Sequence, residues 1–182
     1  MKILSIPASN SGTSINRQLL TYAKAIIEES SPEVEVEMVD INDYELAIYS
    51  PEREEAGGIP DKAKELFDKI GAADAIMMSF AEHNGSYTAA WKNTYDWMSR
   101  IDSAVYQQKP VSMFGASPGG RAAAGVLGNA TSTASFFGAE LVSTLGVGTF
   151  YDNFDSDAGK ISDSELDAQF REAVLALVKA SS

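Results

Sequence analysis

The first stretch with residue types suited to binding chemistry is a run of ten small, uncharged residues at positions 7–16, PASNSGTSIN. It follows a short apolar run and precedes an amphipathic segment, which is typical of a strand passing into a helix. A helix N-terminus offers free backbone amides and about half a positive charge, which suits a phosphate monoester. The side chains expected to add donors are Ser9, Ser11, Thr13, Ser14 and Asn16. An ordinary serine-rich capping turn is the alternative, and the spacing matches neither GxGxxG nor GxxxxGK(S/T).

A second loop, at residues 80–97, contains an asparagine–glycine pair among aromatic side chains. Asn84 and Gly85 are typical of a tight turn, whose exposed amides suit hydrogen bonds to a planar heterocycle. His83 or Tyr87 could border such a ring. As a lone histidine without an obvious partner, His83 is more typical of an exposed turn residue than of a general base.

A third loop, GASPGGRAAAG at residues 115–125, follows another apolar run. Gly119 and Gly120 free the backbone for close approach to a ligand. Arg121 could hold an anionic group. A flexible strand-to-helix turn without a ligand is the alternative.

Acidic residues are absent from the first and third loops and from residues 83–95 of the second. The chain has 26 Asp and Glu residues, yet none lies in residues 5–27, 83–95 or 103–139. We expect the three acid-free windows to form one shared site, although buried segments also lack charge. The formal net charge of −12 argues against partners such as nucleic acids and anionic membranes.

The composition limits the remaining possibilities. A length of 182 residues is typical of a single domain, here residues 1–182. The absence of cysteine excludes disulfides, thiolate catalysis and Cys-ligated metals, and one histidine excludes a His-rich metal site. An aspartate-rich stretch at residues 155–165 does not match a calcium-binding loop, because its glycine comes one position too early and Leu166 stands where the bidentate acid belongs. With no secretory signal and no run long enough to span a membrane, we expect a cytoplasmic protein.

Strand-like and helix-like segments alternate five times along the chain. Such an α/β pattern predicts a parallel sheet with helices on both faces, and ligands bind beyond the carboxyl ends of its strands. We expect strands at residues 2–6, 33–39, 73–80, 110–117 and 140–145. We expect helices at residues 14–29, 61–70, 87–100 and 120–137 and from residue 162, and a polar loop at residues 50–60.

Two helices carry more specific expectations. In the helix at residues 87–100, Trp91, Tyr95 and Met98 form one stripe, which is more typical of core or subunit contact than of cofactor binding. At the start of the last helix, SDSE at residues 162–165 has the spacing of a capping box.

These loops resemble the NADPH-dependent FMN reductase family of flavodoxin-like proteins, which includes azoreductase-like and quinone or chromate reductase members. The family's first loop reads roughly Gly-Ser-x-Arg-x-x-Ser-x-Asn-x-x-Leu, and Ser9, Ser14, Asn16 and Leu19 fall in those positions. Its second loop reads roughly Pro-Glu-Tyr-Asn-Gly-Ser, followed by Leu-Lys-Asn-x-x-Asp-Trp. This chain has AEHNGS and WKNTYDW there, and the resemblance covers nearly its whole length.

The resemblance implies a role for each loop and a fold. It assigns phosphate contacts to Ser9, Ser14 and Asn16. It assigns flavin-ring contacts to Glu82, His83, Asn84 and Gly85, and ring-edge and ribityl contacts to Ser117, Gly119 and Gly120. It also implies a flavodoxin-like, doubly wound five-stranded parallel sheet in the order 2-1-3-4-5.

The chain departs from the family pattern at three positions. The first-loop arginine is missing, with Asn10 or Ser11 near its place, and Ala81 and His83 replace the proline and tyrosine of the second loop. A lost charge-assisted phosphate contact is worth about 1.5–3 kcal/mol. That loss weakens FMN binding by roughly one to two decades.

The activity that the resemblance implies is hydride transfer from NADPH or NADH through FMN to a quinone, azo, metal-ion or free-flavin acceptor. No catalytic side chain is required, because the cofactor carries the chemistry. The resemblance also implies a homodimer or homotetramer, with Trp91, Tyr95 and Met98 as candidate interface residues. The alternatives are an electron carrier of flavodoxin type and a flavin-binding module with weakened affinity.

Overall fold

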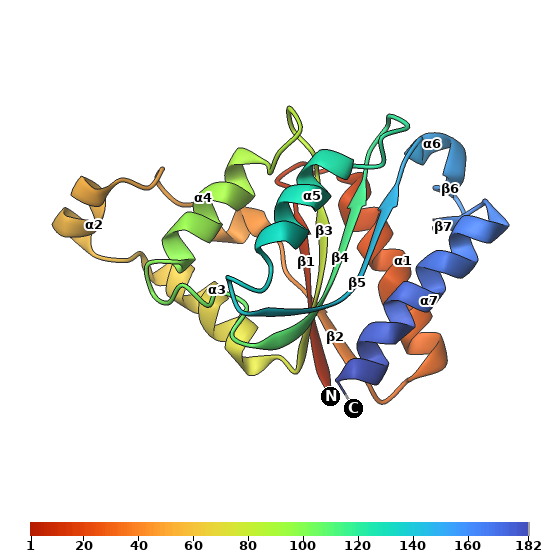
Figure 1. Ribbon diagram of the computed structural model, residues 1–182, viewed down its shortest axis with the longest axis horizontal. Helices are drawn as coiled ribbons and strands as arrows, with labels where there is room; N and C mark the ends of the chain where they lie inside the picture. Colours follow the sequence, from red (N-terminus) through yellow and green to blue (C-terminus); the bar gives the residue numbers. More distant parts are fainter. Residues whose placement is uncertain (182) are drawn as a thin grey trace.

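The computed structural model describes residues 1–181 and places a parallel sheet of five strands at their centre (Figure 1). The strand order β2-β1-β3-β4-β5 confirms the predicted flavodoxin-like arrangement. β3 is buried along its whole length, as expected of a strand covered on both faces. The strands are β1 (Lys2–Ala8), β2 (Glu35–Met38), β3 (Ala75–Phe80), β4 (Lys109–Ala116) and β5 (Ala139–Val147).

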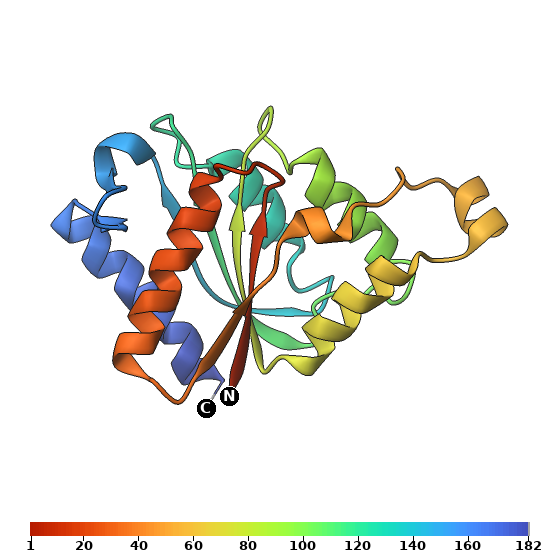
Figure 2. The same ribbon diagram turned by 180° about the vertical axis from the view of Figure 1, so that it is seen from behind.

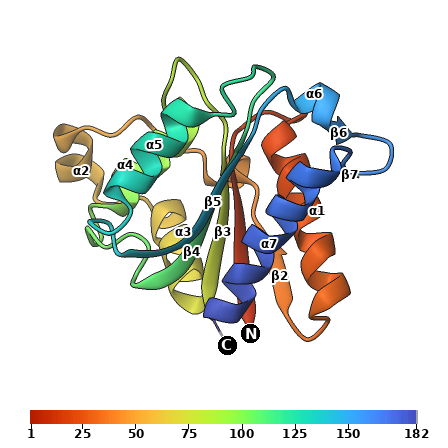
Figure 3. The same cartoon turned by 45° about the vertical axis from the view of Figure 1, so that its right-hand side comes forward.

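Helices cover both faces of this sheet (Figures 1 and 3). One face carries α1 (Ile15–Ser30) and α7 (Ser164–Ala180), whose apolar side chains share a core with the sheet. The other face carries α3 (Asp61–Ala72), α4 (Ala89–Met98) and α5 (Ala124–Thr133), which enclose a second core. Residues 1–181 contain no helix long and apolar enough to cross a membrane.

The register of the sheet brings the expected loops together. Ala8 at the end of β1 pairs with Phe80 at the end of β3, and Phe80 pairs with Gly115 near the end of β4. The three loops that follow these strands therefore begin side by side at one edge of the sheet.

The expected loop at residues 50–60 is wrong, because it contains the helix α2 (Pro51–Gly57). Ser50 caps this helix by accepting a hydrogen bond from Arg53 N, and Pro51 occupies its first turn. None of the residues of α2 is buried, and the helix projects away from the sheet (Figures 1 and 2).

The structure also contains short elements that the sequence did not predict. They are the 3-10 helix η1 (Ile41–Tyr44), α6 (Phe150–Asn153) and the hairpin of β6 (Phe154–Asp155) and β7 (Lys160–Ile161).

The expected aromatic stripe faces the core rather than a partner subunit. Trp91 and Met98 are 0% exposed and Tyr95 is 7% exposed, and all three pack in the core beside α3 and α5. They are therefore wrong as candidate interface residues, because a side chain with almost no accessible surface contributes little to a contact between chains.

The capping box predicted for the last helix is also wrong in detail. The N-cap of α7 is Asp163, whose carboxylate accepts a hydrogen bond from Leu166 N at 2.8 Å. The helix thus starts one residue later than the box requires.

The edge strand β2 is tied to its neighbours by ion pairs. Glu37 lies 2.6 Å from Lys2 Nζ and 2.7 Å from Lys69 Nζ. The hydrogen bond from Lys2, followed by the one from Lys69, lowers the pKa of the Glu37 carboxyl group.

Candidate functional site

The loop between β1 and α1 is shaped by its own hydroxyl groups. Ser9 Oγ accepts from Ser11 N, and Ser11 Oγ accepts from Thr13 N, each at 3.3 Å. Ser14 is the N-cap of α1, and its Oγ accepts from Arg17 N at 3.2 Å. The first turn of α1 contains no acidic residue, so no side-chain charge opposes the positive end of the helix there.

Asn16 links this loop to the sheet. Its side chain is 2% exposed, and its Oδ1 accepts from Ser79 Oγ at 2.7 Å and from Ala116 N at 2.8 Å. Its Nδ2 donates to Ala116 O at 3.3 Å. Both oxygen lone pairs and one of the two amide hydrogens are therefore used inside the protein, which leaves one hydrogen for a ligand.

The second loop contains the expected tight turn. His83 N donates to Ser86 O at 3.0 Å and Ser86 N donates to His83 O at 3.1 Å. Asn84 and Gly85 have φ values of 53° and 77°, which are typical of a two-residue type I′ turn. His83, Asn84 and Gly85 are exposed in this turn.

Glu82 connects the second loop to the helix that follows the third. Its Oε2 accepts from Val126 N at 2.8 Å, within the first turn of α5. The N-cap position of α5 is Ala123, which offers no side-chain acceptor, so the carboxylate of Glu82 takes over that function. A Cβ atom on Gly125 would lie 2.7 Å from the backbone oxygen of Gly85 and 2.9 Å from this carboxylate oxygen, so glycine is needed there.

The third loop is held against the end of β5, because Ser117 N donates a hydrogen bond to Val147 O at 3.0 Å. Ser117 Oγ accepts from Ala123 N at 3.2 Å and donates to Gly119 O at 2.9 Å. Ala122 and Ala123 have left-handed φ values of 52° and 57°, which cost free energy for alanine. The expected helix at residues 120–137 is shortened for this reason, and α5 starts only at Ala124.

The three loops together enclose a cavity of about 230 Å³. Its lining includes eight of the expected site residues: Ser9, Ser11, Thr13, Ser14, Asn16, Glu82, His83 and Ser117. Five other expected residues lie outside this lining, in exposed or partly exposed turns: Asn84, Gly85, Gly119, Gly120 and Arg121. Tyr151 of α6 also lines the cavity and is 69% exposed; no feature of the sequence pointed to it.

Charged side chains contribute little to this cavity. Glu82 is its one acidic lining residue, and neither lysine nor arginine lines it among the described residues. Arg17 is bound to Asp40 at 2.6 Å, whereas the Arg121 guanidinium makes no hydrogen bond or ion pair within residues 1–181. An anion in this cavity would therefore be recognised by backbone amides and hydroxyl groups. No cluster of His, Asp or Glu side chains in the described part of the chain could hold a metal ion.

The sheet order and the site at its carboxyl edge define a flavodoxin-like protein. Solved structures share this fold. The flavoenzyme NAD(P)H:(acceptor) oxidoreductase FerB from Paracoccus denitrificans aligns with a TM-score of 0.80 at 22% identity, over 99% of this chain and 96% of that chain. An azoreductase from Bacillus anthracis aligns with a TM-score of 0.70 at 17% identity, over 98% and 99%.

The chain belongs to the NADPH-dependent FMN reductase family, whose profile matches residues 1–151. It is 31% identical to an NAD(P)H-dependent FMN reductase of Pseudomonas aeruginosa, over 65% of this chain and 61% of that protein. It is 32% identical to an NADPH:quinone oxidoreductase of Arabidopsis thaliana, over 66% and 62%. The aligned part thus spans about three fifths of the length of these relatives.

Proposed function

We propose that this protein is an FMN-dependent NAD(P)H oxidoreductase that reduces a small acceptor such as a quinone, an azo compound, a metal ion or free flavin. The observation that carries the proposal is the cavity where the N-terminus of α1 meets the loops after β3 and β4. Membership of the FMN reductase family supports it. Relatives named as FMN and quinone reductases support it as well.

The chemistry of the first loop fits the phosphate group of FMN. Ser9, Ser11, Thr13 and Ser14 line the cavity with hydroxyl groups, and the acid-free first turn of α1 adds its backbone amides. Neutral donors and a helix N-terminus bind phosphate without a cationic side chain. We assign Asn16 mainly to positioning, because its amide holds the end of β4.

The second and third loops fit the flavin ring and the ribityl chain. His83 and Ser117 line the cavity, and the exposed turn at Asn84 and Gly85 presents backbone groups nearby. Tyr151 adds an exposed aromatic side chain to the lining of the cavity. When bound, FMN supplies the chemistry of accepting hydride from NAD(P)H and passing electrons to the acceptor.

A charge placed at the N-cap of α1 tests the phosphate site. Ser14→Asp keeps a capping oxygen but puts a negative charge beside the expected phosphate, so FMN binding should fall at least about a hundredfold. The matched control is Ser103→Asp, an exposed serine far from the cavity lining. FMN affinity is measured by flavin fluorescence titration, and NADPH oxidation with a quinone is measured beside it. An unchanged titration in Ser14→Asp would contradict the proposed site.

We also propose that the protein is a homodimer or homotetramer. Ile48, next to the projecting helix α2, is 74% exposed, and Phe136, after α5, is 75% exposed. Exposed apolar side chains mark a contact region where they form a contiguous patch, so the surface around each of these two residues is the part of the molecule to test. Light scattering after gel filtration gives the mass, and Ile48→Asp should lower it if this segment lies at a subunit contact. A monomer mass for the unmodified chain would contradict the proposal.

A further inference from the structure

Residues of α4 and α5 line an open groove of about 350 Å³, called the α4–α5 groove below. Its walls include Ser86 and Tyr87, which directly follow the tight turn of the second loop, and Phe137, which follows α5. Tyr95 forms part of its floor, because this side chain is only 7% exposed and still lines the groove. The groove is therefore a hollow with aromatic walls beside the second loop of the candidate cofactor site.

An exposed aromatic side chain lies at the edge of this groove. Phe136 is 75% exposed, and its ring contacts the ring of Phe137 at a centroid distance of 5.0 Å. The Phe137 ring contacts Tyr95 at 5.0 Å, and Tyr95 contacts Tyr87 at 6.4 Å. A continuous row of rings thus leads from the exposed side chain into the groove. Contiguous apolar surface marks a contact site, and aromatic side chains are enriched in the contacts between proteins.

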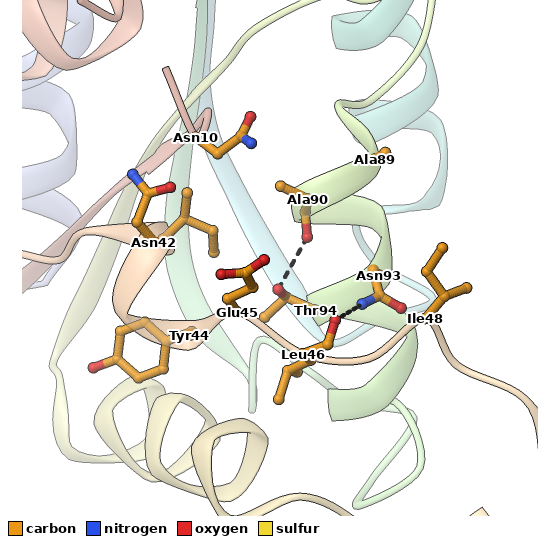
Figure 4. Close-up of a pocket in the computed structure, with 11 residues that line it drawn as sticks. Asn10, Asn42, Tyr44, Glu45, Leu46, Ile48, Ala89, Ala90, Asn93 and Thr94 are labelled. Atoms are coloured by element: carbon orange, nitrogen blue, oxygen red, sulfur yellow. Dashed lines mark hydrogen bonds between the residues drawn. The ribbon is translucent and has the colours of Figure 1, made fainter. Parts of the chain in front are cut away.

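The other flank of α4 is already covered by the chain itself. Figure 4 shows Ala90, Asn93 and Thr94 on that flank, beside Leu46 and Ile48 of the segment that follows η1. Asn93 Nδ2 donates to Leu46 O at 3.0 Å, so this segment is held against α4, with a cavity of about 270 Å³ between them. The flank of α4 that faces α5 is the one left open to a partner.

The distribution of charge favours a second copy of this chain as that partner. Two chains with a net charge of −12 repel each other, so they can associate only through a face with few acidic residues. α5 contains no charged residue, and the two charged residues of the groove, Lys92 and Asp96, pair with each other at 2.6 Å. The exposed Ile48, by contrast, lies next to α2, which carries three glutamates and one arginine. Two α2 helices would therefore repel each other.

The shape of the same face suits a symmetric contact. In a dimer with a twofold axis the same surface patch of both copies is in contact, so a protrusion and a hollow on one patch can fill each other. Here the exposed ring of Phe136 is the protrusion, and the α4–α5 groove beside it is the hollow.

We propose that two copies of this chain associate through the α4–α5 groove, and that Phe136 of each copy inserts into the groove of the other. This inference rests on the homo-oligomer proposed above and names its contact surface. Because Ser86 and Tyr87 line the groove, the second copy also packs against the second loop of the candidate cofactor site.

Cross-linking tests this contact directly, because the chain has no cysteine of its own. Ser132 lines the groove, Ser135 is next to Phe136, and both are exposed. Copies carrying Ser132→Cys are mixed with copies carrying Ser135→Cys and treated with a short bismaleimide, and mixed dimers are identified by mass spectrometry. The matched control pairs Ser132→Cys with Ser30→Cys, an exposed position at the end of α1 on the opposite face of the sheet.

The first pair should give at least about tenfold more mixed dimer than the control pair, because the contact raises the effective concentration of the two thiols to about the millimolar range. Ile48→Asp, introduced into both cysteine variants, should leave this yield unchanged. Equal yields from the first pair and the control pair, or no cross-link in either, would overturn the proposal.

A charge at the edge of the groove tests the contact without a linker. Phe136→Asp should lower the mass measured by light scattering by a factor of about two, because the contact would bury two unpaired carboxylates. The fold should be retained, because Phe136 is exposed, and far-ultraviolet circular dichroism checks this.

The outcomes separate this contact from the proposals on which it rests. If the unmodified chain is an oligomer, but Phe136→Asp keeps its mass and the first pair does not cross-link, the oligomer stands and this contact is wrong. If the unmodified chain is a monomer, the oligomer and the contact both fail. The reductase function is independent of either result, because FMN titration and NADPH oxidation test it separately.

Discussion

Replacing Asn16 by alanine should destabilise the fold much more than it disturbs a direct contact with the cofactor. The side chain accepts hydrogen bonds from Ala116 N at 2.8 Å and Ser79 Oγ at 2.7 Å and donates to Ala116 O at 3.3 Å. All three residues are at most 2% exposed, so water cannot replace the lost partner. The substitution therefore affects buried polar groups on two strands.

The magnitude follows from the groups that lose their side-chain partner. Each buried polar group left without a partner costs about 1–3 kcal/mol. The hydroxyl of Ser79 can rotate to another acceptor, so only the amide and the carbonyl of Ala116 count. The sum is about 2–6 kcal/mol, a large part of the roughly 5–15 kcal/mol that stabilises a domain.

Equilibrium unfolding in urea of the protein without flavin, followed by far-ultraviolet circular dichroism, measures this change. With a slope of about 2 kcal/mol per molar urea, the midpoint should fall by about 1–3 M. Asn10→Ala is the control, because Asn10 is exposed and its side chain makes no hydrogen bond or ion pair within residues 1–181; its effect should stay within about 0.5 kcal/mol. Full stability of Asn16→Ala combined with lost FMN binding would refute the reasoning and assign the amide to the ligand.

Three further predictions follow from the site and the sheet. Arg121→Ala should raise the KM for NADPH more than it lowers the flavin content, as steady-state kinetics and absorbance would show; the reverse would assign Arg121 to the flavin. Gly146→Ala should prevent stable folding, because its Cβ would lie 2.0 Å from Ala122 O; an unchanged melting temperature would contradict this. Glu37 has a lowered pKa in the folded state, so its ion pairs stabilise the protein above the unfolded carboxyl pKa and lose that effect as the pH falls through the folded value. Urea unfolding of Glu37→Gln should accordingly show a deficit of about 1 kcal/mol at pH 7 that shrinks towards pH 3; a deficit independent of pH would contradict it.

The sheet and the helices that pack on it could be predicted from the sequence, because their apolar residues recur with the period of the element. β3 is apolar apart from Ser79 and is buried along its whole length, and α1 carries its apolar residues on one face. The convergence of the three loops followed from the parallel sheet alone, since strand ends in such a sheet meet at one edge.

The projecting helix α2 could not be found from periodicity, because it buries no residue. Its sequence does contain a local signal, since Ser50 and Pro51 have the types favoured at an N-cap and a first helical position. The polar composition of the segment is equally typical of an exposed loop.

Other errors reflect information that lies in the tertiary structure. The stripe of Trp91, Tyr95 and Met98 showed that one face of α4 is apolar, but not which partner covers it. Asn16 is polar and lies in the first turn of α1, directly after a loop rich in donors, so its burial against Ala116 could not be inferred. Tyr151 reaches the cavity from α6, which follows β5, and its position depends on the path of the chain after that strand.

The way α2 is attached to the rest of the protein determines how easily this helix unfolds locally. The helix is joined to the body by polar contacts, among them the ion pair of Arg100 Nε with Glu54, in the middle of α2, at 2.9 Å. Surface contacts of this kind contribute little to the free energy of local opening. Residues of α2 should therefore exchange their amide hydrogens, and be cleaved by a protease, much faster than residues of the sheet. After cleavage between residues 51 and 57, residues 46–49 would still be hydrogen-bonded to Asn93. The two fragments would therefore remain associated.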